Sequence, residues 1–211
     1  MRKKERYQAF VDYFSTHQPE AETELHYNDP FQLLIAVILS AQCTDKRINQ
    51  VTPALFNRYP NPESLAASSP DEVFNYIRSV SYPNNKAKHL VGMAQTLINE
   101  FGGEMPTNIA DLQKMPGVGR KTANVIISVV HKAPAMAVDT HVFRVANRIG
   151  LTLNAKTPLS MEKQLVKNLP EDKIYIAHHW LILHGRYICV ARKPKCSICP
   201  LTSFCKYYAQ H

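Results

Sequence analysis

Four of the five cysteines lie within 17 residues near the end of the chain, in a C-x6-C-x2-C-x5-C run: Cys189, Cys196, Cys199 and Cys205. Four thiolates at this spacing could form two disulfides, bind one zinc ion or hold an iron-sulfur cluster. Disulfides are least favoured, because the N-terminus lacks an apolar signal segment and a reducing, cytoplasmic setting is expected. Only one C-x2-C pair typical of zinc sites is present, so the spacing slightly favours iron-sulfur.

A second candidate site is the string MPGVGRK, which spans residues 115–121 and contains Gly117 and Gly119. Glycine lets the backbone adopt positive φ and approach a ligand closely. At the start of a helix, free N–H groups and the helix dipole favour an anion, so this turn could bind a DNA phosphate. A tight turn between two helices would also explain the glycines.

The charge of the chain indicates an anionic partner. Lysine and arginine number 25 against 17 acidic residues, which gives a net charge of +8. Arg192, Lys193 and Lys195 fall inside the first cysteine loop, where a metal-bound loop could present them to phosphates. Solvated loop residues are the alternative.

Apolar residues recur with helical spacing along almost the whole chain, and strand-like alternation is scarce. No apolar run reaches the roughly 18 residues that a membrane span needs. We therefore predict an all-α fold of two helical lobes. The expected helices are 7–14, 31–39, 49–56, 62–67, 71–78, 85–101, 109–114, 121–131, 140–149, 161–168 and 173–189.

The longer string LQKMPGVGRKTAN, residues 112–124, resembles the helix-hairpin-helix of DNA repair glycosylases. LSAQCTD at 39–45, VDTHVFRV at 138–145 and HHWLILHGR at 178–186 are similar to further segments of that superfamily. The cysteine run matches its cluster-bearing branch. The chain thus resembles the endonuclease III family, whose members are DNA glycosylases and AP lyases with a [4Fe-4S] cluster.

The resemblance implies that Lys121 is the nucleophile and Asp139 the catalytic carboxylate. Lys121 should lie in the first turn after the hairpin, where the helix dipole disfavours an ammonium, and partial burial would favour the neutral amine further. Attack on C1′ would displace a damaged base, and β-elimination would then break the strand. Asp139 also fits the N-cap of the helix 140–149, and one carboxylate can serve both roles.

The family also implies residues that contact DNA. Gln42 matches the glutamine that fills the hole left by the extruded base, and a second wedge is expected in the turn after Val80. There the family commonly has glycine and leucine, whereas this chain has Ser81 and Tyr82, which leaves Tyr82 as an aromatic wedge. The expected DNA contacts are Gln42, Tyr82, Gly117, Gly119, Arg120, Arg192, Lys193 and Lys195.

The resemblance further implies a six-helix domain over residues 23–132 with the hairpin, and a second domain formed by 1–22 and 133–211. The substrate would be double-stranded DNA with damaged pyrimidines or abasic sites, bound by a monomer in the cleft between the domains. In a bacterium the enzyme would be associated with the nucleoid. Two alternatives are a monofunctional adenine-type glycosylase and a non-catalytic DNA-binding module. Lys121 counts against the first, and Lys121 with Asp139 against the second.

Several other polar residues are expected to have packing roles. His178, His179 and His184 lie among apolar residues and should be packed or hydrogen-bonded rather than metal-bound. His141, Arg144 and Arg148 could contact phosphates or pair with acids inside the fold, and structural roles are at least as well favoured. Cys43 stands apart from the other cysteines and is predicted to pack as a small hydrophobe.

Overall fold

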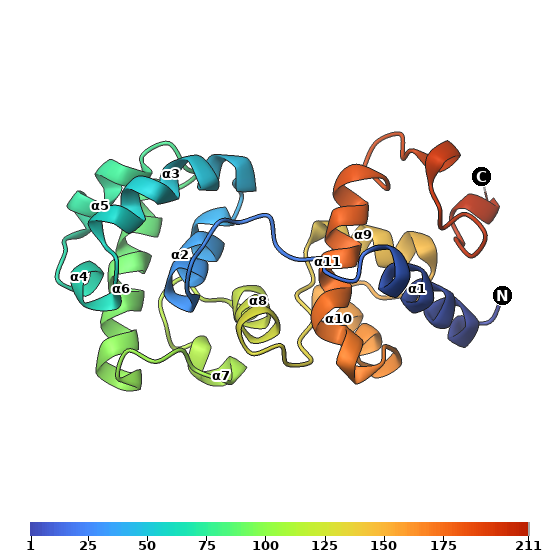
Figure 1. Cartoon of the computed structure of the whole chain (residues 1–211), viewed down its shortest axis with the longest axis horizontal. Coiled ribbons are helices and arrows are strands. Elements are labelled where there is room, and N and C mark those ends of the chain that lie inside the picture. Colours follow the sequence, from blue (N-terminus) through green and yellow to red (C-terminus); the bar gives the residue numbers. More distant parts are fainter. Residues whose placement is uncertain (211) are drawn as a thin grey trace. The chain divides into compact units, whose positions relative to one another are not determined.

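A computed structural model describes residues 1–210, and these residues form α-helices and two short 3₁₀ turns, with no strand among them (Figure 1). The predicted all-α class is therefore confirmed. None of the helices in this described range is both long and apolar enough to cross a membrane.

The chain divides into two compact units. Residues 24–131 form the hairpin unit. Residues 1–23 and the chain from Lys132 onward form the cysteine unit, so the N-terminal helix packs with the C-terminal part of the chain.

The hairpin unit is built around a helix that is buried along almost its whole length. Helix α2, Pro30–Ser40, is nearly all apolar, so it needs cover on all sides. It contacts α3, α6 and α8. Its start follows the expected signal: Asp29 is the N-cap, and its side chain accepts a hydrogen bond from the Gln32 N–H at 2.8 Å.

Local capping explains most of the remaining boundaries in this unit. Helix α3, for example, begins at Asp45 rather than at the predicted Asn49, because the Thr44 side chain caps it. Proline occupies the first helical position in α2, α4, α5 and α6. The other helices are α3 (Asp45–Arg58), α4 (Pro62–Ala66), α5 (Pro70–Ile77), α6 (Pro83–Phe101), α7 (Ile109–Leu112) and α8 (Arg120–Val130).

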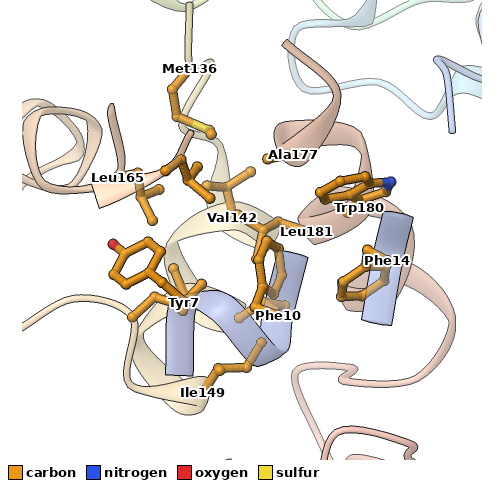
Figure 2. Close-up of a cluster of buried hydrophobic side chains, with 14 of the residues drawn as sticks. Tyr7, Phe10, Phe14, Met136, Val142, Ile149, Leu165, Ala177, Trp180 and Leu181 are labelled. Atoms are coloured by element: carbon orange, nitrogen blue, oxygen red, sulfur yellow. The ribbon is translucent and has the colours of Figure 1, made fainter. Parts of the chain in front are cut away.

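The cysteine unit has an aromatic core between α1 (Lys3–His17) and α11 (Glu171–Tyr187) (Figure 2). The Phe14 and Trp180 rings are stacked with centroids 5.6 Å apart, and Phe10 meets Trp180 edge-on. The Trp180 indole N–H donates to the Gln18 carbonyl at 2.8 Å. These contacts attach the N-terminal helix to the end of the chain.

Two more helices and two 3₁₀ turns complete the cysteine unit. Helix α9 spans Thr140–Ile149, which agrees with the predicted range. Helix α10, Pro158–Asn168, begins three residues before the predicted Met161, because Thr157 caps it and Pro158 opens it. The 3₁₀ turns are η1 (Cys196–Ile198) and η2 (Tyr208–Gln210).

Candidate nucleic-acid interface and cysteine site

The hairpin between α7 and α8 is anchored by buried apolar side chains and turned by a glycine. Met115 and Val118 are buried. Gly117 has φ +80°, and a Cβ at this position would lie 2.9 Å from His89 Cβ, so both backbone and space require glycine. Gly119 differs, because a Cβ there would meet nothing within 4 Å. No packing reason for glycine therefore exists at Gly119.

Lys121 is the second residue of α8, directly after the hairpin. Gly119 is the N-cap of this helix and offers no side-chain cap, so the N–H groups of the first turn face outward from an uncapped end. The predicted place of Lys121 in the first turn is confirmed, and the helix dipole acts on it there. The expected partial burial is wrong for this DNA-free structure, in which Lys121 and Arg120 are exposed.

Asp139 is the N-cap of α9, as the sequence predicted. Its Oδ1 accepts a hydrogen bond from the Val142 N–H at 2.8 Å, and the residue is half-buried. This bond fixes the orientation of the carboxylate and leaves Oδ2 outside the cap. Lys121 belongs to the hairpin unit and Asp139 to the cysteine unit.

Two exposed side chains of the hairpin unit stand on left-handed backbone. Gln42 has φ +56° and follows the end of α2, while Tyr82 has φ +54° and is the N-cap of α6. Tyr82 is 63% exposed although its ring is large and apolar. We call Ala41–Gln42 and Ser81–Tyr82 the wedge turns. A left-handed conformation is uncommon for residues other than glycine, and such residues are often found at functional sites.

Lys86 lies beneath the wedge turns, and the sequence interpretation missed it. It is only 5% exposed, and its Nζ donates to the carbonyls of Leu39 and Ala41. A signal was available: Lys86 shares a face of α6 with Leu90 and Met93, at i+4 and i+7. A lysine on the apolar face of a helix indicates a buried, hydrogen-bonded ammonium.

The four clustered cysteines line one pocket of the cysteine unit, together with His184, Leu201 and other residues of that unit. Cys189 is buried and the other three are half-buried. Burial raises the pKa of the Cys199 and Cys205 thiols, and the charge of neighbouring cysteines raises it further. The sequence-distant thiols are therefore close enough in space to interact.

The four thiols are a donor set for a metal centre. All four line the same pocket, and cysteine thiolates are the ligands of [4Fe-4S] clusters. Four thiolates are also a zinc donor set, so the pocket fits both metal alternatives.

Two arginines of α9 bind backbone carbonyls at the first cysteine and in the loop that follows it. Arg144 donates to the carbonyls of Cys189 and Gly185 at 3.0 and 2.8 Å. Arg148 donates to the carbonyls of Val190 and Ala191 at 2.8 and 2.9 Å. Both guanidinium groups bind backbone carbonyls, so the structure supports the structural role that the sequence left open for these two arginines.

The loop of residues 190–195, which we call the cation loop, turns its charges outward. Arg192, Lys193 and Lys195 are all exposed. Lys193 has φ +52°, and the Lys195 N–H donates to the Ile188 carbonyl at 3.0 Å, which closes the loop. The carbonyls bind the arginines of α9 while the cationic side chains remain available to an anion.

The histidines of α11 are packing residues, as predicted. His178, His179 and His184 are buried, and the rings of the first two lie 3.8 Å apart. Burial lowers the pKa of His179 and of His184 to about 4, so both are neutral near pH 7. His184 Nε2 lies 3.6 Å from Cys199 Sγ, which links the aromatic core to the cysteine pocket.

Cys43 is half-buried beside Gln42, in the connection between α2 and α3. Its N–H donates to the Ser40 carbonyl at 3.0 Å.

Two family models match the chain. Residues 35–171 match the HhH-GPD superfamily of base excision DNA repair proteins, and residues 189–205 match the iron-sulfur binding domain of endonuclease III. The second match covers the four clustered cysteines from the first to the last. The prediction of an iron-sulfur cofactor is thereby confirmed.

Curated relatives and solved structures agree. Endonuclease III of Rickettsia prowazekii is 48% identical over 195 residues, 92% of each chain. Endonuclease III of Bacillus subtilis is 45% identical over 188 residues, 89% of this chain and 86% of its own. A trapped endonuclease III–DNA covalent intermediate superposes with a TM-score of 0.92 at 42% identity, covering 100% of this chain and 99% of that one.

These matches confirm the predicted family, fold and enzyme class. The chain belongs to the endonuclease III family, and it is a DNA glycosylase and AP lyase of base excision repair that carries a [4Fe-4S] cluster.

Proposed function

We propose that this enzyme removes oxidised pyrimidines from duplex DNA and cleaves the strand through a Schiff base at Lys121. The observation that carries the proposal is the position of Lys121. Its exposed amine follows the hairpin in the first turn of α8, beside the uncapped start of that helix. A lysine amine in its neutral form is suited to nucleophilic attack on carbon.

The chemistry begins at the sugar of the damaged nucleoside. The neutral Nζ of Lys121 bonds to C1′ as the glycosidic bond breaks, and the base leaves with its electron pair and takes up a proton. The sugar ring opens and the amine loses a proton, which gives an imine between Nζ and C1′. The imine acidifies the C2′ protons, and removal of one of them expels the 3′ phosphate by β-elimination.

Asp139 supports the first step. Its carboxylate stabilises the positive charge that develops on the sugar, and it accepts the proton that the Lys121 ammonium loses before attack. The hydrogen bond from the Val142 N–H to Oδ1 holds the carboxylate in one orientation. Such preorganisation is needed because a carboxylate that first had to rotate would stabilise the transition state less.

DNA is held by two phosphate-binding regions in this proposal. In the hairpin unit one phosphate group binds at the uncapped start of α8. It contacts the backbone around Gly117 and Gly119 and the side chain of Arg120. The open space at Gly119 supports this role, since a side chain would block the approach. In the cysteine unit the cation loop contacts further phosphates.

Cys189, Cys196, Cys199 and Cys205 hold the [4Fe-4S] cluster in this proposal. When bound, the cluster supplies a cross-link between the two ends of the cation loop and the C-terminal segment. Arg148 supports the loop by binding two of its carbonyls, and Arg144 binds the carbonyl of Cys189 just before it. The acid–base and nucleophilic groups belong to Lys121 and Asp139.

Borohydride trapping tests the nucleophile. Duplex DNA with thymine glycol should give a covalent adduct with the native enzyme, because only a Schiff base is reduced to a stable bond. Lys121→Gln should abolish the adduct while DNA affinity remains close to native. Lys163→Gln, an exposed lysine of α10, is the matched control and should trap normally.

Asp139→Asn separates the catalytic role of this residue from its capping role. Asparagine caps helices as well as aspartate, so the melting temperature should stay near native. Base release should slow by about 10²- to 10⁴-fold, the usual contribution of a positioned acid–base group. The proposed chemistry fails if Lys121→Gln still forms the adduct or if Asp139→Asn releases bases at the native rate.

A further inference from the structure

The two wedge turns are joined to each other by the side chains of Ser81 and Lys86, while the Gln42 and Tyr82 side chains take no part in these bonds. The turns are separated by about 40 residues of sequence, yet Ser81 and Lys86, which flank Tyr82, bond to Leu39, Ala41 and Gln42. The Ser81 hydroxyl donates to the Gln42 carbonyl at 2.6 Å. The Lys86 Nζ donates to the Leu39 and Ala41 carbonyls at 2.8 and 2.7 Å.

Lys86 has the central place in this arrangement. Its ammonium binds carbonyls at the C-terminus of α2, where the helix dipole is negative and carbonyls lack helical partners. Its own N–H donates to the Tyr82 carbonyl at 3.1 Å and forms the first helical bond of α6. A single residue therefore contacts the end of α2, where the first wedge turn begins, and the residue that caps α6, where the second wedge turn ends.

A buried ammonium is a costly way to join two helices. Burial lowers the pKa of Lys86, although the nearby Cys43 opposes this effect. Replacing buried charged groups by apolar ones is often neutral or stabilising for a fold, so stability alone does not explain a lysine here. A point donor that binds two carbonyls does constrain their geometry closely.

Ser81 adds a further bond between the two turns. Its hydroxyl reaches the carbonyl of Gln42 itself. The carbonyls of both Ala41 and Gln42 are therefore held from the second turn. These bonds use only the backbone atoms of Gln42 and Tyr82. The exposed side chains of these two residues take no part in them.

We propose that Lys86 and Ser81 lock the two wedge turns into one rigid, two-pronged element, in which Lys86 is the positioning residue for insertion of Gln42 and Tyr82 into the DNA stack. This inference rests on the proposed roles of Gln42 and Tyr82 in filling the space around an extruded nucleotide. Its physical basis is that both prongs must enter the stack together. If the turns move independently, one prong reaches the duplex while the other is misplaced, and the unstacking energy is not recovered.

The test follows insertion separately from chemistry. The probe is a duplex with a tetrahydrofuran abasic analogue, with which Lys121 cannot react, opposite 2-aminopurine, whose fluorescence rises when it is unstacked. At saturating enzyme the native protein should raise the emission. Lys86→Met keeps a long unbranched side chain but removes the donors, and it should lose most of this rise. Ser81→Ala should lose part of it.

Two kinetic measurements give the second readout. Release of thymine glycol in a single turnover requires extrusion of a base, and Lys86→Met should slow it on the order of 10- to 100-fold, as for a misplaced catalytic geometry. Borohydride trapping on a preformed abasic site needs less rearrangement of the stack and should fall much less. Lys88→Met and Ser79→Ala, exposed neighbours of Lys86 and Ser81, are the matched controls and should behave as native protein.

The outcomes distinguish the wedge from the chemistry. A native fluorescence rise in folded Lys86→Met, or an equal loss of base release and trapping, overturns the positioning role. If Lys86→Met does not fold, Ser81→Ala decides, and native insertion and base release in that variant overturn the proposal. Absence of trapping in the native enzyme would contradict the Schiff-base chemistry, whereas the fluorescence measurement would still report on the wedge.

Discussion

The wedge turns and the cation loop solve a similar problem in different ways. Each is irregular backbone that carries side chains expected to meet DNA, and each is held by cationic groups that bind main-chain carbonyls. In the hairpin unit the ammonium of Lys86 binds the end of α2. In the cysteine unit the guanidinium group of Arg148 binds two carbonyls of the cation loop, and that of Arg144 binds the carbonyl of Cys189 just before it.

The two regions differ in the support that they have besides the cationic side chains. The wedge turns lie directly at the ends of two packed helices, α2 and α6, so helix packing already places them nearly correctly. The cation loop has no helix of its own and depends on cysteines at both ends. Lysine suits the first case because it is a compact point donor, and arginine suits the second because its planar fork reaches successive carbonyls.

The largest expected effect tests the dependence of the cation loop on the cluster. Cys199→Ser should remove bound iron and destabilise the cysteine unit by at least about 4 kcal/mol, the linkage expected for a site filled a thousandfold above its dissociation constant. DNA affinity should fall as the loop loses one of its supports. Iron analysis, thermal melting and binding to labelled duplex measure these losses.

The same variant sharpens the comparison, because the hairpin unit should be spared. At saturating protein, Cys199→Ser should still unstack 2-aminopurine opposite an abasic analogue. Cys43→Ser is the matched control in the hairpin unit and should retain native iron. Loss of the unstacking signal in Cys199→Ser would show that the wedge turns depend on the cluster, and the contrast between the two regions would be wrong.

A smaller effect is expected at the two glycines of the hairpin, which separate packing from DNA contact. Gly117→Ala places a side chain on left-handed backbone, which costs about 1–2 kcal/mol, and the contact with His89 adds to this cost. Gly119→Ala enters open space and should cost at most about 1 kcal/mol of stability. Chemical denaturation measures both.

The effects on DNA affinity should have the opposite order, once the affinity is corrected for the fraction of folded protein. Gly119→Ala should weaken duplex binding, because its methyl group occupies the space through which a phosphate approaches the start of α8. If Gly119→Ala binds DNA as native protein does, the hairpin backbone does not contact the phosphate. The open space at Gly119 would then have no functional meaning.

The sequence predicted the elements whose signals are local. Asp139 and Thr140 defined the start of α9, and Asp29 with Pro30 defined that of α2, because capping depends on residues within one turn. The hairpin was visible for the same reason. The start of α3 was missed because its capping residue, Thr44, lies in the segment LSAQCTD, which had been interpreted as a DNA-contacting motif.

The long-range hydrogen bonds that hold the wedge turns and the cation loop could not be predicted from local signals. Lys86 binds carbonyls 45 and 47 residues away, and Arg148 binds carbonyls 42 and 43 residues away. Every residue has a carbonyl, so such bonds leave no trace in the residue type of the acceptor. Only the donor can be noticed, as a charge placed on an apolar helix face.

The smallest expected effect concerns the charges of the cation loop. Arg192→Gln, Lys193→Asn and Lys195→Gln together should weaken duplex binding about tenfold at moderate salt, or about 1.4 kcal/mol. Asparagine is chosen at Lys193 because it tolerates the left-handed backbone there. If all three cations contact phosphates, the slope of log affinity against log salt should fall by about 2.7.

A matched triple variant distinguishes placed charge from total charge. Lys156, Lys163 and Lys167 are exposed lysines in and next to α10 of the same unit, and replacing them by glutamine removes an equal charge. A local contact requires that only the loop variant lowers the salt slope, with iron content native in both. An equal loss in both variants would show that net charge attracts the DNA. The arginines of α9 would then support the cluster rather than a phosphate-binding surface, and precise placement of DNA-contacting groups would be a property of the wedge turns alone.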